Sequence, residues 1–306
     1  MQNCPKYIQI RRLVSHPSQP RVVDESLTLN PSDTLPPSLV AFIKSCDTLF
    51  LGTSYLASPS QAAGFPSHLG MNHRGGRPGF VRVRSDGRTL VLQDYSGNRF
   101  FSSLGNIETD PVAGLVIPNF ATGDVLYLTC QAHNLFDAEA EAIMPRAKCI
   151  TLLRATGYTF VENALPFREA EGTLELSPYD PPIRYLAEEK ELPTPQDALA
   201  RLSGIALHSS SNVTRAPGLA TFTFTTSHPI SYKAGQYAIL DTLPLIGEMP
   251  YVHMNKGDEK SPNEDGVRTW SVPSSPPFSA PNPTTGPSPP PLPPPTSFSL
   301  TIRHID

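Results

Sequence analysis

The sequence predicts a mainly β protein, and three observations support this fold class. Short runs of alternating apolar and polar residues recur along the chain. Turn signals, among them Asp86-Gly87 and Thr122-Gly123-Asp124, separate several of these runs. Helical spacing of apolar residues is confined to a few short segments. Many short strands between turns are typical of sandwiches and barrels, so we expect a closed or half-closed β-barrel in the first part of the chain.

The length of 306 residues is enough for two ordinary domains with a linker. Hydrophobic residues make up 39% of the chain, which supports a core, whereas the 35 prolines gather in clusters that indicate local loops. We expect an N-terminal arm or the remnant of an upstream barrel, then a barrel, a linker and a partial second barrel with a proline-rich insertion. The expected bounds are 1–36, 37–165, 166–197 and 198–306, with the insertion at 273–296.

The elements of the first barrel follow from local patterns. Apolar residues at helical spacing predict short helices, and alternation or apolar runs predict strands. The expected helices are 38–43, 100–107 and 138–144, and the expected strands are 7–10, 48–53, 79–83, 89–93, 113–117 and 125–130, with a strand pair over 150–161.

The second part of the chain contains fewer strand signals. We expect a short helix at 198–203 and strands at 220–225, 236–240, 269–272 and 298–303. Residues 273–296 are of low complexity and contain two triplets of proline, which is typical of polyproline II or disordered segments. Because the sequence ends on a strand just after this insertion, we expect the second barrel to be incomplete.

Charge and hydropathy exclude several classes of function. The net charge of −4 gives no reason to expect nucleic acid or an acidic membrane surface as a partner. No run of 18 apolar residues that could span a membrane occurs in the sequence. Lys6, Arg11 and Arg12 are not followed by the apolar run of a secretory signal. We therefore expect a cytoplasmic protein.

The four cysteines are Cys4, Cys46, Cys130 and Cys149, and none belongs to a CxxC pair. This spacing predicts buried, reduced thiols and no metal site. The sequence also has no GxSxG, HExxH or Walker motif, so it assigns no general acid, base or nucleophile. The catalytic residues are left unknown at this stage.

A basic, glycine-rich segment begins at His73. Arg74, Arg77 and Arg82 lie around the Gly75-Gly76 pair. Arginine binds phosphate through two parallel hydrogen bonds, and glycine lets backbone N–H groups approach an anion. The alternative interpretation is a solvated basic hairpin.

A second polar cluster lies where a short helix should begin. Asn98, Arg99 and Ser103 would add side-chain donors to the unpaired N–H groups of that helix start. This arrangement predicts a phosphate site, and the alternative is a helix cap with a surface arginine.

The run from residue 78 to 117 resembles the pyridoxamine 5'-phosphate oxidase-like FMN-binding split barrel. The matching pieces are Gly97-Asn98-Arg99, Asp110-Pro111 and Gly114-Leu115-Val116-Ile117. The resemblance covers roughly residues 38–165. It implies that Asn98 and Arg99 hold the FMN phosphate, followed by Arg82 and Arg74 and then by Ser103.

A second resemblance involves Arg268-Thr269-Trp270-Ser271, which is similar to the signature of the ferredoxin-reductase-type FAD barrel, with Gly235-Gln236-Tyr237 as the preceding turn. It implies that Arg268 meets the FAD pyrophosphate, Trp270 stacks on the isoalloxazine and Ser271 approaches the flavin N5. Pro273 departs from the family pattern, as does the proline-rich insertion. An edge strand with a surface tryptophan is the alternative.

Together these resemblances imply a flavin-dependent oxidoreductase that transfers electrons or a hydride through FMN or FAD, with NAD(P)H as a possible external donor and an unknown substrate. A flavin-binding module without turnover and a truncated, non-functional product are the alternatives. Split barrels of this family place FMN between two barrels, so we expect a homodimer. The segment 3–9 is similar to one that closes an upstream barrel in larger relatives, and a free N-terminal arm is the alternative.

Overall fold

The computed structural model describes residues 5–97, 99, 101–189, 207–216, 219–230, 237–242, 257, 263, 266–271 and 296–303. The described chain is mainly β with antiparallel sheets, as the sequence predicts. It divides into two compact units. The first comprises residues 1–191 and 250–264, and the second comprises residues 192–249 and 265–306.

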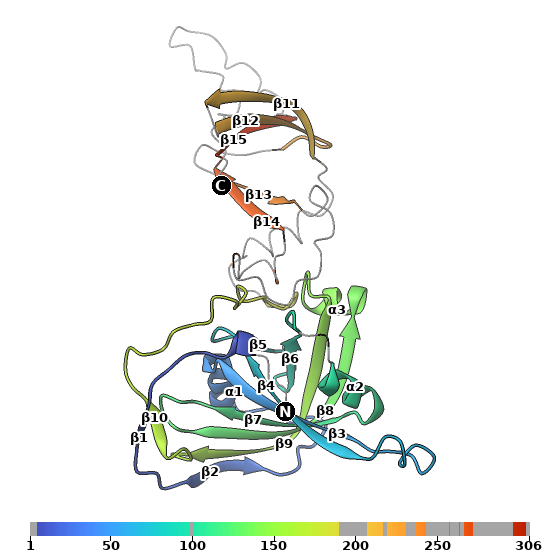
Figure 1. Cartoon of the computed structure of the whole chain (residues 1–306), viewed down its shortest axis with the longest axis vertical. Helices are drawn as coiled ribbons and strands as arrows, with labels where there is room; N and C mark the ends of the chain where they lie inside the picture. The colour runs from blue at the N-terminus through green and yellow to red at the C-terminus, as the bar shows by residue number, and fades with distance from the viewer. Residues whose placement is uncertain are drawn as a thin grey trace. The chain divides into compact units, whose positions relative to one another are not determined.

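The first unit is built on an eight-stranded antiparallel sheet. Its strands follow the order β4-β3-β7-β8-β9-β6-β5, and β2 pairs with β9 beside this path. Figure 1 shows β7, β8 and β9 running side by side. The strands are β2 (Arg21–Ser26), β3 (Thr48–Tyr55), β4 (His68–Gly75), β5 (Val81–Val83), β6 (Thr89–Gln93), β7 (Val112–Pro118), β8 (Val125–Phe136) and β9 (Cys149–Glu162).

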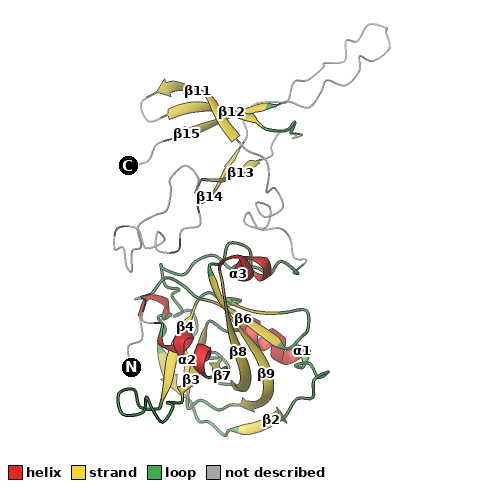
Figure 2. Cartoon of the chain, turned by 90° about the vertical axis from the view of Figure 1, so that its right-hand side faces the viewer, coloured by secondary structure: helices red, strands yellow, loops and turns green. Residues whose placement is uncertain are grey.

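Shorter elements complete this unit. Strands β1 (Leu13–Ser15) and β10 (Phe167–Glu169) form a separate antiparallel pair. Helix α2 packs against β3 and β8 (Figure 2), and helix α1 packs against β5. The helices are η1 (Pro5–Tyr7), α1 (Pro37–Ser45), α2 (Ser102–Thr109) and α3 (Asp137–Ile143).

One hydrophobic core lies inside the curved sheet. Alternate residues of β8 are buried, including Leu126 and Leu128, and they meet Leu49 of β3, Leu90 of β6 and Leu153 of β9 in the same cluster. Strands from both ends of the sheet therefore share one core, which requires the sheet to curl.

Most of the predicted elements of this unit are confirmed. The three helices and the strands at 48–53, 79–83, 89–93, 113–117 and 125–130 are found, with shifted ends. The predicted turn at Asp86-Gly87 joins β5 to β6, and Gly87 has the positive φ of 64° that such turns require.

Two element predictions are wrong. Residues 7–10 do not form a strand: η1 ends at Tyr7, and Ile10 makes only an isolated bridge to Glu175. Residues 150–161 are not a strand pair but part of the single strand β9. Gly157 within β9 does not mark a turn. It leaves room for the chain after β2, because a Cβ there would lie 2.5 Å from the carbonyl oxygen of Leu27.

The second unit contains two small antiparallel sheets. One consists of β11 (Leu207–Ala216), β12 (Leu219–Thr226) and β15 (Ser297–Arg303), and the other of β13 (Tyr237–Asp241) and β14 (Val267–Ser271). The four predicted strands of this part are confirmed, and β11 was not predicted. Phe224 stacks on Phe222 and on Phe298. The predicted helix at 198–203 and nearly all of the insertion at 273–296 lie outside the described residues.

The described cysteines have free thiols, as the sequence predicts. Cys46 and Cys130 are buried with free thiols, Cys149 is half-buried, and Cys4 lies outside the described residues. None of the helices in the described part of the chain is long and apolar enough to cross a membrane.

Substituting Gly157 with alanine should destabilise the first unit by about 1–3 kcal/mol, because the new methyl group meets the backbone of residues 26 and 27, which cannot rotate away. Gly114→Ala in β7 is the matched control, since a Cβ there meets nothing within 4 Å. Chemical denaturation of both variants measures the difference. Equal stability of the two variants would contradict the close approach of Leu27 to Gly157.

Candidate functional site

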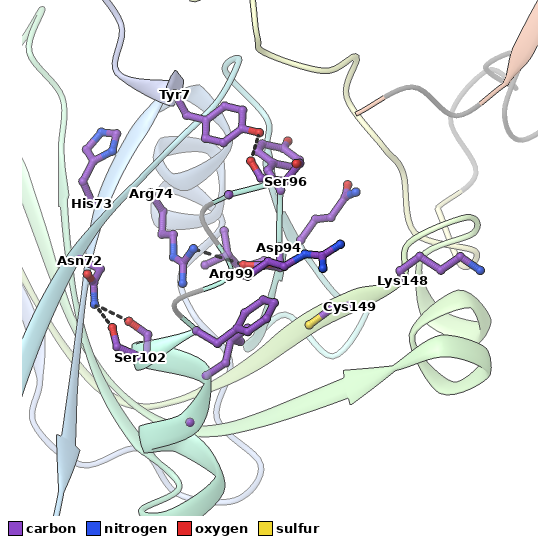
Figure 3. A pocket seen from close by; sticks show the side chains of 18 of the residues that line it. Tyr7, Asn72, His73, Arg74, Asp94, Ser96, Arg99, Ser102, Lys148 and Cys149 are labelled. Carbon is purple, nitrogen blue, oxygen red and sulfur yellow. Dashed lines mark hydrogen bonds and ion pairs between the residues drawn. The ribbon is translucent and has the colours of Figure 1, made fainter. Parts of the chain in front are cut away.

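The first unit contains a cavity of about 800 Å³ beside strand β4, the turn after β6 and the start of α2 (Figure 3). Basic, hydroxyl and aromatic side chains share its wall. The lining residues are Tyr7, Asn72, His73, Arg74, Gly75, Phe80, Leu92, Gln93, Asp94, Tyr95, Ser96, Gly97, Arg99, Phe101, Ser102, Ser103, Leu104, Gly105, Glu108, Phe136, Lys148 and Cys149.

Strand register places the polar residues of β4 over the core side of the sheet. Arg74 pairs with Leu49 and Asn72 with Leu51, and both leucines are fully buried. Directly paired residues point to the same face of a sheet. Asn72 and Arg74 therefore face inward, toward α2.

Asn72 connects β4 to the first turn of α2. Its Nδ2 donates to the Oγ of Ser103 at 2.6 Å and lies 3.4 Å from the Oγ of Ser102. Figure 3 shows these contacts beside the start of the helix. Ser103 is buried, so this hydrogen bond fixes the helix end against the edge strand.

Arg74 pairs with Asp94, with 3.3 Å between Nη1 and Oδ1. Burial raises the pKa of Asp94, and the attraction of Arg74 opposes this rise. The Nε of Arg74 is buried and has no hydrogen-bond partner among the described residues. A buried guanidinium donor without a partner is costly, so this atom favours a ligand acceptor beside it.

The backbone entering α2 has an unusual conformation. Arg99 and Phe101 have φ values of 57° and 43°, in the left-handed region that side chains other than glycine seldom adopt. Each such residue costs roughly 1–3 kcal/mol, and residues of this kind concentrate at functional sites. Phe101 is the N-cap and provides no side-chain cap, so the first turn of α2 keeps N–H groups for another acceptor.

Further charges lie around the cavity. Arg99 is exposed, and Lys148 lies 3.6 Å from Glu141 of α3 with most of its side chain exposed. The carboxylate of Glu108 accepts a hydrogen bond from the buried amide of Asn134. Together with Arg74, the two cations outnumber the carboxylates of Asp94 and Glu108 in the lining.

Aromatic rings form another part of the wall. Tyr7 and Tyr95 have ring centroids 5.1 Å apart with a tilt of 53°. Burial raises the pKa of Tyr95, so its hydroxyl stays protonated at neutral pH. Phe80, Phe101 and Phe136 complete this apolar part of the lining. The cavity therefore combines a basic helix start with aromatic surface.

Two titratable groups of the lining are neutral at neutral pH. Burial and the neighbouring charge of Arg74 lower the pKa of His73 to about 4. Burial raises the pKa of Cys149 to about 12, so its thiol is not an active nucleophile.

The structure brings together three of the predicted site residues, Arg74, Arg99 and Ser103, in the lining of this cavity. Asn98 lies outside the described residues. Arg82 is not in the lining. Its buried guanidinium pairs with Glu189, with 3.0 Å between Nε and Oε2, and lies over the ring of Tyr185.

The predicted FAD ligands lie on β14, of which the structure describes the backbone. Arg268, Trp270 and Ser271 are paired in register with Leu240, Ala238 and Tyr237 of β13. Their roles remain predictions.

Sequence analysis missed several residues of the site, among them Tyr7, Asn72 and Lys148. Tyr7 comes from a segment interpreted as a strand, and Asn72 lies on β4, for which no strand was predicted. The spacing of Asn72 and Arg74, two residues apart, was the signal that both would share one face of a strand.

Comparison with known proteins adds little to this description. No family model matches the chain, and no curated protein matches it. Among solved structures, the chain is similar to the crystal structure of HupZ from Group A Streptococcus, with a TM-score of 0.29 and 10% sequence identity. That match covers 40% of this chain and 92% of the other.

Asp180 is a buried acid in the first unit, 3% exposed, whose charge acts on Tyr95 in the cavity wall. Burial raises its pKa to about 6, against the lowering effects of Gln9 and Arg77. Because the pKa in the folded state lies above the ordinary value, this carboxyl group costs stability as the pH rises from about 4 to above 6.

Asp180→Asn should therefore stabilise the protein at pH 7.5, by on the order of 1–2 kcal/mol. The gain should shrink as the pH falls to 4.5. His73 acts in the opposite sense, since its lowered pKa removes stability as the pH falls from about 6.5 to 4. Comparing the variant with the wild type at each pH cancels that effect. Thermal unfolding at several pH values measures the difference, and a loss of stability at every pH would contradict the prediction.

Proposed function

We propose that the cavity of the first unit binds FMN and that the chain is a flavin-dependent oxidoreductase. The observation that carries this proposal is the combination of a basic, uncapped helix start with aromatic walls in one cavity. A bound flavin supplies the hydride or electron transfer, and the protein supplies binding and orientation.

The described residues fit such a group. The Nε of Arg74, the guanidinium of Arg99 and the N–H groups at the start of α2 would hold the phosphate. Tyr7, Tyr95 and Phe101 offer surface for the ring system. A volume of about 800 Å³ lies within the usual range of cofactor pockets.

The protein's own residues serve mainly to bind and orient. With His73 neutral, Cys149 a thiol and Tyr95 protonated, no group among them is prepared for acid–base work near pH 7. Arg74 and Asp94 form an ion pair in the lining of the cavity, which orients the guanidinium for an incoming anion.

For the second unit we propose FAD binding through Arg268, Trp270 and Ser271, with NAD(P)H as an external donor in the cytoplasm. A flavin-binding module without turnover is the competing function. Absorbance near about 450 nm and mass spectrometry of the released ligand test for flavin and identify it. An NADPH oxidation assay on the loaded protein then separates an enzyme from a binding module.

Arg99→Ala should weaken FMN binding by roughly 1.5–3 kcal/mol, as expected when a charged hydrogen bond is lost. Riboflavin, which has no phosphate, should lose much less affinity. Titration calorimetry with both ligands measures the two effects.

Arg21→Ala is the control for this charge change, because Arg21 pairs with Glu162 on an exposed part of the sheet and is not in the cavity lining. It should leave both affinities unchanged. Equal losses for FMN and riboflavin in Arg99→Ala would refute the phosphate assignment.

We also propose that the protein is a homodimer. The sheet face opposite the core exposes Leu69 and Met71 of β4, Val112 of β7 and Tyr127 of β8. An exposed apolar patch of this kind favours association, and the commonest closed arrangement is a two-fold dimer.

Met71→Asp should therefore convert the dimer to a monomer and lower its affinity for FMN, because a charge is then buried without a partner. Sedimentation velocity over a dilution series, with and without FMN, is the measurement. A wild-type monomer that binds one FMN per chain would overturn this proposal.

A further inference from the structure

Asn263 makes an unusually complete set of contacts in the first unit. In the sequence it lies between β13 and β14, which are strands of the second unit, yet residues 250–264 belong to the first unit. Its side chain contacts three segments that are far apart in the chain.

The amide of Asn263 both accepts and donates hydrogen bonds. Its Oδ1 accepts from the backbone N–H of Ser96 at 3.0 Å. Its Nδ2 donates to the Oη of Tyr7 at 2.8 Å and lies 3.4 Å from the carbonyl oxygen of Tyr179. The Oη of Tyr7 in turn donates to the carbonyl oxygen of Ser96 at 2.7 Å, as Figure 3 shows.

These partners define the orientation of the amide. The N–H of Ser96 can only donate and the carbonyl of Tyr179 can only accept, so a flipped amide at position 263 would lose both contacts. Aspartate at this position would keep the acceptor and lose the donors. Only an asparagine-like group satisfies all three partners.

Two of these partners form the wall of the proposed FMN cavity. Tyr7 and Ser96 line it, and Tyr95, which precedes Ser96 in the chain, packs its ring on Tyr7. The turn that Asn263 holds also carries Asp94, the partner of Arg74. A displaced turn would therefore change both the aromatic wall and the orientation of the phosphate-binding arginine.

A second interaction holds the same tyrosines. Lys6 is buried, and its Nζ lies 5.2 Å from the ring centroid of Tyr7 and 5.7 Å from that of Tyr179. This cation–π pair holds the two rings. Asn263 connects both tyrosines to the turn, in addition to the direct hydrogen bond from Tyr7 to Ser96.

We propose that Asn263 is a positioning residue of the cavity, which holds the wall formed by Tyr7 and residues 94–97 in its binding conformation. The proposal rests on the proposed function for its consequence in ligand binding, but not for the structural role. Because β13 precedes residues 250–264 in the sequence and β14 follows them, the segment that carries Asn263 is covalently connected to the second unit at both of its ends.

The first experiment is amide hydrogen exchange of the full chain without ligand. Asn263→Ala should speed exchange across residues 92–103 and leave the exchange of β8 and β9 unchanged. Asn119→Ala is the matched control, because Asn119 accepts hydrogen bonds from Ala121 and Thr122 in the turn between β7 and β8 and is not in the cavity lining. Asn119→Ala should leave the amide exchange rates of residues 92–103 unchanged.

The second experiment is a comparison of ligands. Asn263→Ala should weaken the binding of riboflavin as well as that of FMN, each by roughly tenfold or more, because the wall contacts the ring system that both ligands share. Arg99→Ala should affect mainly FMN. A double-mutant cycle with Tyr7→Phe should show coupling, since the second substitution removes the hydroxyl through which Asn263 acts.

The outcomes separate the two proposals. Unchanged exchange at residues 92–103 in Asn263→Ala would overturn the positioning role, whatever the protein binds. Faster exchange together with a wild-type protein that binds no flavin would support the positioning role and reject FMN as the ligand. Additive effects of Asn263→Ala and Tyr7→Phe on affinity would show that Asn263 does not act through Tyr7.

Discussion

The pairing of β8 with β9 is the constraint on which the rest of the first unit depends. The two strands are paired from Val125–Val161 at one end to Phe136–Cys149 at the other. β9 also holds β6 and β2, and β8 holds β7, so most of the sheet is attached to this pair. Because a strand buries only alternate residues, a pair this long fixes both the register and the core face of its neighbours.

The same pair contains one of the two places where the described sheet departs from regular register, and the other lies in β2, between Val22 and Asp24. A bulge occurs between Thr129 and Cys130, opposite Gly157. There the chain after β2 comes close to the backbone of Gly157, and Leu29 donates a hydrogen bond to the carbonyl of Thr156. A bulge increases local twist. The curl of the sheet around its core and the docking of the N-terminal segment are therefore linked.

A rigid core of this kind allows strain elsewhere. Helix α2 packs on β3 and β8, and Asn106 within it donates to Thr53 of β3. These contacts hold the helix whatever the conformation of the residues before it. The left-handed residues Arg99 and Phe101 are thus maintained by packing that they do not themselves provide. The packing of α2 offsets the conformational free energy that these two residues cost.

Much of the fold could be predicted from the sequence because β6 to β9 follow the usual rule of apolar residues inward. β4 does not follow it. Its apolar residues Leu69 and Met71 are exposed, whereas Asn72 and Arg74 face the inner side. A pattern with polar residues inward gives no strand signal to an analysis that looks for a core face. The inward-facing polar residues of β4, Asn72 and Arg74, both line the cavity.

The site was harder to predict because its decisive contacts are distant in sequence. Arg82 looked equivalent to Arg74, but Glu189, 107 residues away, neutralises it. Tyr7, Ser96 and Asn263 meet across up to 256 residues. Local composition identifies arginines near a glycine-rich turn. Only the fold decides which of them keeps a donor available.

The difference between Arg74 and Arg82 determines how the cavity could bind an anion. Arg74 gives its Nη1 to Asp94 and retains a buried Nε without a partner among the described residues. A phosphate oxygen beside Nε would satisfy this donor and leave the hydrogen bond from Nη1 to Asp94 in place. The negative charge would then lie near Asp94, whose pKa is already raised by burial, so a proton taken up by Asp94 would relieve the repulsion. Anion binding at this site should therefore raise the pKa of Asp94 further, an effect that binding by an exposed basic patch would not produce.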